Sequence, residues 1–151
     1  MKRFVLALAA IVITAGVSAQ TAVKTNAKVV TAESAVKFKS LVHDFGKIKK
    51  DVPVTYEFAF TNTTDKPIVI ESASASCGCT TPVWPQTPIA KGKTDKITAG
   101  FNAQNLGTFT KSIYVKVAGI DKPVEIKITG EVLSAVDYAK YEKEKELKKS
   151  K

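Results

Sequence analysis

Histidine, cysteine and methionine, which supply many catalytic and metal-binding side chains, are nearly missing from this sequence. Its 151 residues include one histidine, two cysteines and one methionine. No H-E-x-x-H zinc helix, G-x-S-x-G nucleophile turn or glycine-rich dinucleotide loop occurs. The carboxylates are scattered singly, so local spacing assembles neither a two-carboxylate hydrolase site nor a calcium loop. We therefore expect a protein that is not an enzyme and carries no cofactor.

Arginine is also nearly missing, although the chain is basic. Lysine and arginine together number 23 against 14 acidic residues, which gives a net charge of +9, and the single arginine is Arg3. Because the single guanidinium group is at residue 3, the rest of the chain lacks the forked donors that commonly read phosphate and guanine. The sequence thus argues against nucleic acid as a partner and predicts a lysine-rich surface that keeps the protein in solution.

Long apolar runs are confined to the N-terminus. Residues 4–15 are mostly apolar, follow Lys2 and Arg3, and lead to a small-residue cleavage pattern that ends at Ala19. This arrangement predicts a secretory signal peptide over residues 1–19, and an uncleaved anchor is the competing interpretation. Cleavage leaves a net charge of about +7 and a mature chain with no membrane span. We expect the protein to be periplasmic or secreted.

Composition divides the remaining chain into three parts. Residues 20–35 are polar and lack aromatic side chains, which predicts a linker. Residues 36–133 contain short β-branched and aromatic runs separated by turn-forming residues, and their length suits one domain with one core. Residues 134–151 are rich in glutamate and lysine and are predicted to form a charged tail, either a solvated helix or frayed.

Alternating apolar and polar residues identify the strands of the central domain. In residues 53–62, the side chains of Val54, Tyr56, Phe58 and Phe60 point one way and the intervening ones point the other. Further strands are expected at residues 36–45, 68–73, 95–101, 109–118 and 123–132. Six or seven short strands without helical patterns between them predict an all-β fold, an immunoglobulin-like antiparallel β-sandwich.

The two cysteines flank a single glycine, as Cys77, Gly78 and Cys79. An oxidising compartment allows a disulfide between them. The short ring of such a disulfide needs a tight turn, which glycine permits. A ring this short is more typical of a labile redox element than of a stabilising cross-link. Two thiolates at this spacing can instead bind a soft ion such as Cu(I), whereas zinc needs two more ligands. Packing in the core is the third interpretation. Packing or a plain disulfide is favoured, so no metal site is predicted, and copper or redox chemistry is the alternative.

One histidine and one tryptophan complete the candidate residues. His43 beside Asp44 has the pairing of an oriented general base, but a polar pair that satisfies backbone groups next to a turn at Gly46 is favoured. Trp84 lies in a segment stiffened by three prolines, where it is either a binding anchor or a cap on the core. The candidate binding residues are therefore Cys77, Gly78, Cys79, Trp84 and His43.

Several segments together resemble a known bacterial family. They are HDFGKI at 43–48, YEFAFTNTTDKPIVI at 56–70, SCGCTTPVWPQTPIAKGK at 76–93 and GTFTKSIYVKV at 107–117. Over residues 41–132 the chain is similar to the family called domain of unknown function 1573, whose members often have a glycine in the turn at residues 49–51. The resemblance implies an exported protein of bacteria such as Bacteroidetes and an immunoglobulin-like domain of the ASH and PapD-like type. It implies no reaction.

These observations together predict a non-catalytic binding or structural module of the cell envelope. Its partner is expected to be an envelope protein or polymer. A β-sandwich can bind by strand addition at a free edge or through loops at one end, and the loop that holds Cys77, Cys79 and Trp84 is the first candidate for the second mode. The alternative is a thiol-redox or copper-binding protein that uses the Cys77-Gly78-Cys79 motif.

Overall fold

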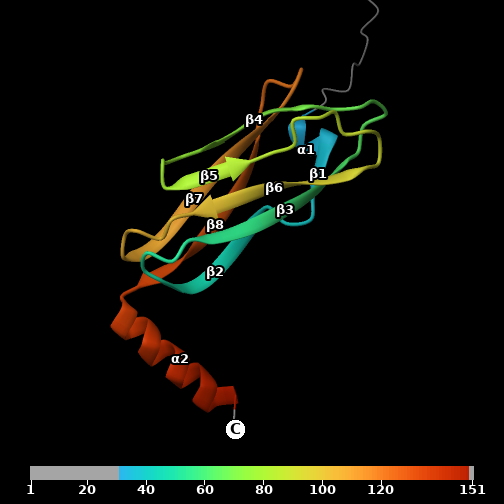
Figure 1. Ribbon diagram of the computed structural model, residues 1–151. Coiled ribbons are helices and arrows are strands. Elements are labelled where there is room, and N and C mark those ends of the chain that lie inside the picture. Colours follow the sequence, from blue (N-terminus) through green and yellow to red (C-terminus); the bar gives the residue numbers. More distant parts are fainter. Residues whose placement is uncertain (1–30, 150–151) are drawn as a thin grey trace, which may run out of the picture.

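The computed structural model describes residues 31–149, so the predicted signal peptide and most of the predicted linker lie outside the described residues. Two four-stranded sheets face each other, and a helix extends from one end of the sandwich (Figure 1). In chain order the elements are α1 (Ala32–Ala35), β1 (Val36–Phe38), β2 (Val42–Lys49), β3 (Val54–Asn62), β4 (Ile70–Ala75), β5 (Thr80–Val83), β6 (Thr94–Phe101), β7 (Gly107–Val117), β8 (Val124–Leu133) and α2 (Ala135–Lys149).

The strand order confirms the predicted immunoglobulin-like β-sandwich. One sheet has the order β1-β3-β6-β5 and the other has the order β2-β8-β7-β4. The paired strands are antiparallel except β2 and β8, which are parallel. This one parallel pair differs from the purely antiparallel expectation. It forms because residues 39–41 carry the chain to the opposite sheet, where β2 lies beside the last strand instead of a sequence neighbour.

Two predictions about individual strands are wrong. The single strand expected over residues 36–45 is split between β1 and β2, which lie in different sheets. The break is at Ser40, whose hydroxyl donates to the carbonyl of Val42 (2.6 Å) and thereby stabilises a local turn instead of a ladder. The prolines suggested a loop after Cys79, but β5 forms there. Pro82 is tolerated because β5 is an edge strand.

Alternate residues of the long strands fill the space between the sheets, as their period predicts. Phe58 and Phe60 of β3 are no more than 1% exposed, and Val54 and Tyr56 pack partly buried against the same core. The other central strands contribute Ile97, Ala99, Phe101, Ile113, Val115, Val117, Val124, Ile126 and Ile128. The end of the predicted linker also reaches this core, because Ala32 and Ala35 of α1 are fully buried.

The turn between β2 and β3 has a left-handed backbone at a residue other than glycine. Asp51 has φ +61°, and Ala103 in the loop between β6 and β7 has φ +52°. The N–H of Asp51 donates to the carbonyl of Ala103 (3.0 Å), so the two loops hold each other. Glycine adopts this backbone without steric cost, so the glycine that the family resemblance implies for this turn would fit it.

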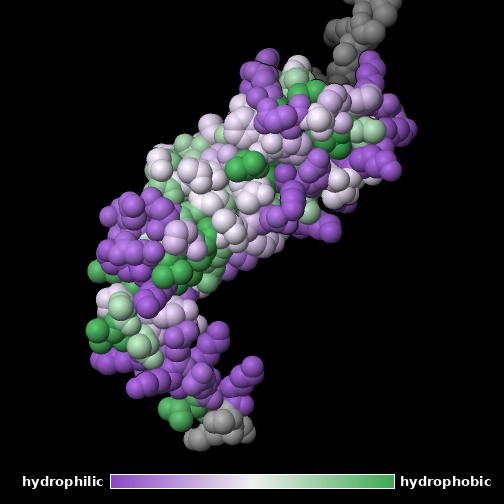
Figure 2. Space-filling view, in the orientation of Figure 1, coloured by the Kyte–Doolittle hydropathy of each residue, from purple (hydrophilic) through white to green (hydrophobic). Residues whose placement is uncertain are grey.

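The charged tail forms α2, and none of its residues is buried. Ser134 caps it, since its hydroxyl accepts the N–H of Asp137 (3.1 Å). The ammonium of Lys47 on β2 lies 5.2 Å from the ring centroid of Tyr141, which connects the helix to the sandwich. Hydrophilic residues cover most of the helix in Figure 2. Within residues 31–149, no helix is long and apolar enough to span a membrane.

Candidate functional site

The two cysteines form a disulfide in the tight turn between β4 and β5. The Sγ atoms of Cys77 and Cys79 are 2.05 Å apart, and their Cα atoms are 5.4 Å apart. Both residues are half-buried, whereas Gly78 between them is exposed. The closed bond occupies both sulfurs, so neither is a thiolate ligand in this state. Residues 31–149 also contain no group of three or more His, Cys, Asp or Glu side chains arranged to hold a metal ion.

A buried hydroxyl lies close to both sulfurs of the disulfide. Thr80 is 4% exposed, and its Oγ1 atom is 3.8 Å from the Sγ atom of Cys77 and 4.0 Å from that of Cys79. Sequence reasoning missed Thr80, because a threonine in a strand is ordinary and only the turn directs its side chain toward the sulfurs. The protein thus places a hydrogen-bond donor within reach of both sulfur atoms.

Trp84 follows β5 directly and is half-buried against the core. Its carbonyl accepts a hydrogen bond from the Gln86 amide (3.2 Å). Its neighbour Val83 is 63% exposed, so the segment presents an aliphatic side chain to solvent while the indole faces inward. The packing of Trp84 matches a cap on the core more closely than a ring held out for a ligand.

His43 lies away from the cysteines. It belongs to β2, whereas Cys77 follows β4, and these are the two opposite edges of one sheet. Three strand spacings separate those edges, about 14 Å. The imidazole stacks on Tyr56 and meets the edge of the Phe45 ring at 4.6 Å between centroids. Burial lowers the pKa of His43, and the carboxylate of Asp44 opposes that shift. The histidine therefore does not join the disulfide in one site.

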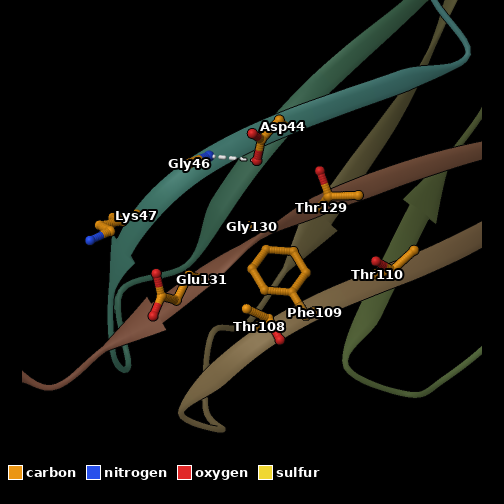
Figure 3. A pocket seen from close by; sticks show the side chains of 9 residues that line it. All are labelled: Asp44, Gly46, Lys47, Thr108, Phe109, Thr110, Thr129, Gly130 and Glu131. Carbon is orange, nitrogen blue, oxygen red and sulfur yellow. Dashed lines mark hydrogen bonds between the residues drawn. The ribbon is translucent and has the colours of Figure 1, made fainter.

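A shallow hollow of about 390 Å³ lies where β2 bulges away from β8. Figure 3 shows its lining side chains, which come from β2, β7 and β8. Asp44 at its edge is engaged locally, because its Oδ1 atom accepts the N–H of Gly46 (2.9 Å). The hollow depends on Gly130, where an added Cβ would lie 2.8 Å from the carbonyl oxygen of Gly46 and 2.8 Å from Cζ of Phe109. Sequence spacing did not reveal this hollow, since three separate strands form it.

Neither sheet closes on itself, so β1, β2, β4 and β5 each have a free edge. Three of these edges are poorly suited to pairing with another strand. β1 has three residues, β2 is interrupted by a bulge between Asp44 and Lys47, and β5 contains Pro82, which has no N–H. Such features are common protections against edge-to-edge pairing.

The fourth edge, β4, is regular near its end. The N–H of Ser76 donates to the carbonyl of Ser112 on β7 (2.9 Å), and the N–H of Ser112 donates to the Ser76 hydroxyl (3.2 Å), so the backbone of Ser76 faces β7. Hydrogen-bonded and non-hydrogen-bonded positions alternate, so the backbone groups of Ala73 and Ala75 face away from β7. β4 also has a bulge, between Ile70 and Ser72, and the regular part after it, residues 72–75, consists of serines and alanines without proline or lysine. This segment therefore presents an open backbone edge with small side chains.

Comparison with solved structures supports the fold. A protein of unknown function from Porphyromonas gingivalis W83 is 17% identical, with a TM-score of 0.56, and covers 70% of this chain, which spans about half (51%) of that protein. The ASH/PapD-like domain 7 of human CEP192 is 8% identical, with a TM-score of 0.58. The match covers 68% of this chain and 87% of that one. The Vibrio cholerae VesB protease is 14% identical, with a TM-score of 0.50 and coverages of 64% and 32%.

These identities are low, so the solved structures show a shared fold only. Comparison with curated proteins finds no match. A family model described as a protein of unknown function, DUF1573, matches residues 36–132, which are nearly the whole sandwich and include the Cys77-Gly78-Cys79 turn. The match confirms the resemblance seen in the sequence: the chain belongs to the DUF1573 family.

Proposed function

We propose that the protein is an exported, non-catalytic immunoglobulin-like module that binds an extended segment of another envelope protein along the free edge of β4. The observation that carries this proposal is the register of the free β4 edge, from which the backbone groups of Ala73 and Ala75 face away from β7. A partner strand would gain main-chain hydrogen bonds at these two residues, and its alternate side chains would supply specificity. Export rests on the predicted signal peptide and the family resemblance.

Side chains along β4 support the choice of partner. Ser74 is exposed and small, so a backbone can approach this edge without displacing a long side chain. Glu71 is held by Lys116, with 3.0 Å between Oε1 and Nζ, at the start of the strand. β4 and β5 lie along the same side of the sandwich in Figure 1, so the partner would also pass the disulfide turn. An extended peptide segment fits this edge better than a polymer without backbone amides.

A single proline substitution at the β4 edge tests whether a partner strand binds there. The processed protein serves as bait in an envelope extract, and Ala75→Pro is compared with Ala75→Val. The proline removes an N–H that does not pair with β7, whereas valine keeps it, so both variants should fold. We expect the wild type and Ala75→Val to capture the same partner and Ala75→Pro to lose at least tenfold of the signal. Equal capture by the folded proline variant would contradict binding at this edge.

Two further measurements examine the other parts of the proposal. The N-terminal sequence of the protein recovered from a periplasmic or secreted fraction should begin at Gln20. Degradation of an envelope polymer by the purified protein, abolished in His43→Ala, would overturn the non-catalytic assignment. We expect no such activity, because the imidazole of His43 is packed against the rings of Tyr56 and Phe45.

A further inference from the structure

The turn around the disulfide is held by bonds other than the disulfide. The N–H of Thr80 donates to the carbonyl of Cys77 (3.3 Å), and the N–H of Asn102 donates to the carbonyl of Cys79 (3.1 Å). Cross-linking residues only two apart removes little entropy from the unfolded chain, so this bond contributes less stability than one that closes a long loop. The sandwich can therefore keep its fold when the S–S bond opens.

Thr80 is better suited to the open state of the cysteine pair than to the closed one. Within the described chain, the hydrogen-bond partners of its buried hydroxyl are the two sulfurs. A disulfide sulfur is a weak acceptor, whereas a thiolate accepts a charge-assisted hydrogen bond. Opening of the bond would thus give this hydroxyl a strong acceptor and would stabilise the released thiolate.

The two sulfurs differ in their surroundings. Cys79 packs against the hydrophobic core, whereas Cys77 is half-buried outside that cluster. Gly78 is exposed, and an added Cβ would meet no atom within 4 Å apart from those of its two chain neighbours, so the outer side of the turn is open. A thiolate that approaches from solvent therefore reaches Cys77 more readily, and Cys79 becomes the leaving group.

From these contacts we infer that the Cys77–Cys79 disulfide is a redox-active group that exchanges two electrons with a dithiol protein of the envelope. A thiolate of the partner attacks Sγ of Cys77 and forms a mixed disulfide with it. The Cys77–Cys79 bond breaks, and Cys79 leaves as a thiolate that accepts a hydrogen bond from the Thr80 hydroxyl. The partner's second thiolate then attacks its own sulfur in the mixed disulfide and releases Cys77. The partner dithiol becomes a disulfide, and this domain gains two electrons and two protons.

Thiol trapping in the native protein tests the inference. The oxidised protein is incubated with dithiothreitol or with a purified thioredoxin-like protein, and free thiols are counted by mass after maleimide labelling. We expect both cysteines to label, circular dichroism to remain that of the folded sandwich, and glutathione disulfide to restore the bond. A disulfide that opens only after unfolding in urea would overturn the inference.

Variants of Thr80 test its role as a positioning residue. In reduced Thr80→Val, the thiolate fraction at neutral pH, measured by absorbance near 240 nm, should fall about tenfold, equivalent to one pKa unit. Thr80→Ser should retain the wild-type value, and so should the control Thr81→Val on the exposed face of β5. Identical thiolate fractions in Thr80→Val and Thr80→Ser would refute this role. Trapping in the wild type needs no substitution and remains decisive if Thr80→Val misfolds.

Discussion

The imidazole of His43 lies flat on the phenol ring of Tyr56, with 3.5 Å between the ring centroids and 5° between the planes. His43 belongs to β2 and Tyr56 to β3, which are in different sheets, so this stack joins the two layers. The ring of Phe58 meets Tyr56 edge-on at 4.9 Å and continues the contact into the core. The only histidine of the chain is therefore part of the packing between the sheets.

Protonation of His43 should destabilise the fold. Burial lowers the pKa of His43 from its usual 6.5, so the unfolded chain binds this proton at higher pH than the folded one. Stability is then lost as the pH falls through 6.5 toward the folded pKa. We expect the melting temperature of the wild type to fall more than that of His43→Phe between about pH 8 and about pH 5. Equal decreases in the two proteins would contradict this effect.

The lowered pKa values of two carboxyl groups should affect stability at lower pH. A hydrogen bond from Lys91 lowers the pKa of Asp65, and one from Ser112 lowers that of Glu125. Stability from these groups is present above their ordinary pKa and is lost as the pH falls through the lowered one. The change in stability above about pH 5 therefore reports the protonation of His43 and not that of Asp65 or Glu125.

Substitution of Asn62, whose amide is buried, should lower the stability of the fold more than substitution of an exposed polar residue. The Nδ2 atom of Asn62 donates to the carbonyls of Lys66 (2.8 Å) and Ile89 (2.9 Å), and its Oδ1 accepts the N–H of Thr64 (2.9 Å). Asn62→Ala leaves these groups unpaired, and we expect the free energy of unfolding to fall by about 2–4 kcal/mol. Urea denaturation measures it. The exposed Asn105→Ala should change stability by no more than about 0.5 kcal/mol.

Gly130 should not tolerate a side chain. A Cβ there would lie 2.8 Å from both the Gly46 carbonyl oxygen and Cζ of Phe109, whose ring stacks on Phe101 at 4.1 Å between centroids. We expect Gly130→Ala to lower the free energy of unfolding by about 1–3 kcal/mol. Gly78→Ala is the matched control, since open space surrounds its Cβ position. Equal urea midpoints for the two variants would refute the steric requirement.

Because Asp51 has a left-handed backbone, substitution by glycine and substitution by a β-branched residue should change the stability of the fold in different ways. Glycine adopts φ +61° freely, so Asp51→Gly should be at least as stable as the wild type despite loss of the exposed pair with Lys50. A β-branched residue is poorly accommodated there, and Asp51→Val should cost about 1–2 kcal/mol. Thermal unfolding of both variants measures the difference. A more stable Asp51→Val would show that this backbone is not strained.

Local patterns predicted the long strands well because each of them alternates on its own. Phe58 and Phe60 are spaced two apart, and the same period recurs in β6, β7 and β8, so their inward faces follow from the pleat. Patterns failed where a residue's role depends on a distant segment. Pro82 suggested a loop, but pairing with β6 makes its segment a strand. Residues 36–45 suggested one strand, but their two halves belong to different sheets.

The candidate site follows the same division. Spacing alone identified the Cys77-Gly78-Cys79 motif and left a disulfide, a metal site and simple packing open. The alternation of side chains determined the sandwich, because any chain with this pattern must bury one face of each strand. Only the tertiary structure decided that His43 lies on the far edge of the sheet, that Thr80 is close to both sulfurs, and that β4 keeps an open edge. These relationships depend on strand order and register, which long-range pairing sets and no local pattern encodes.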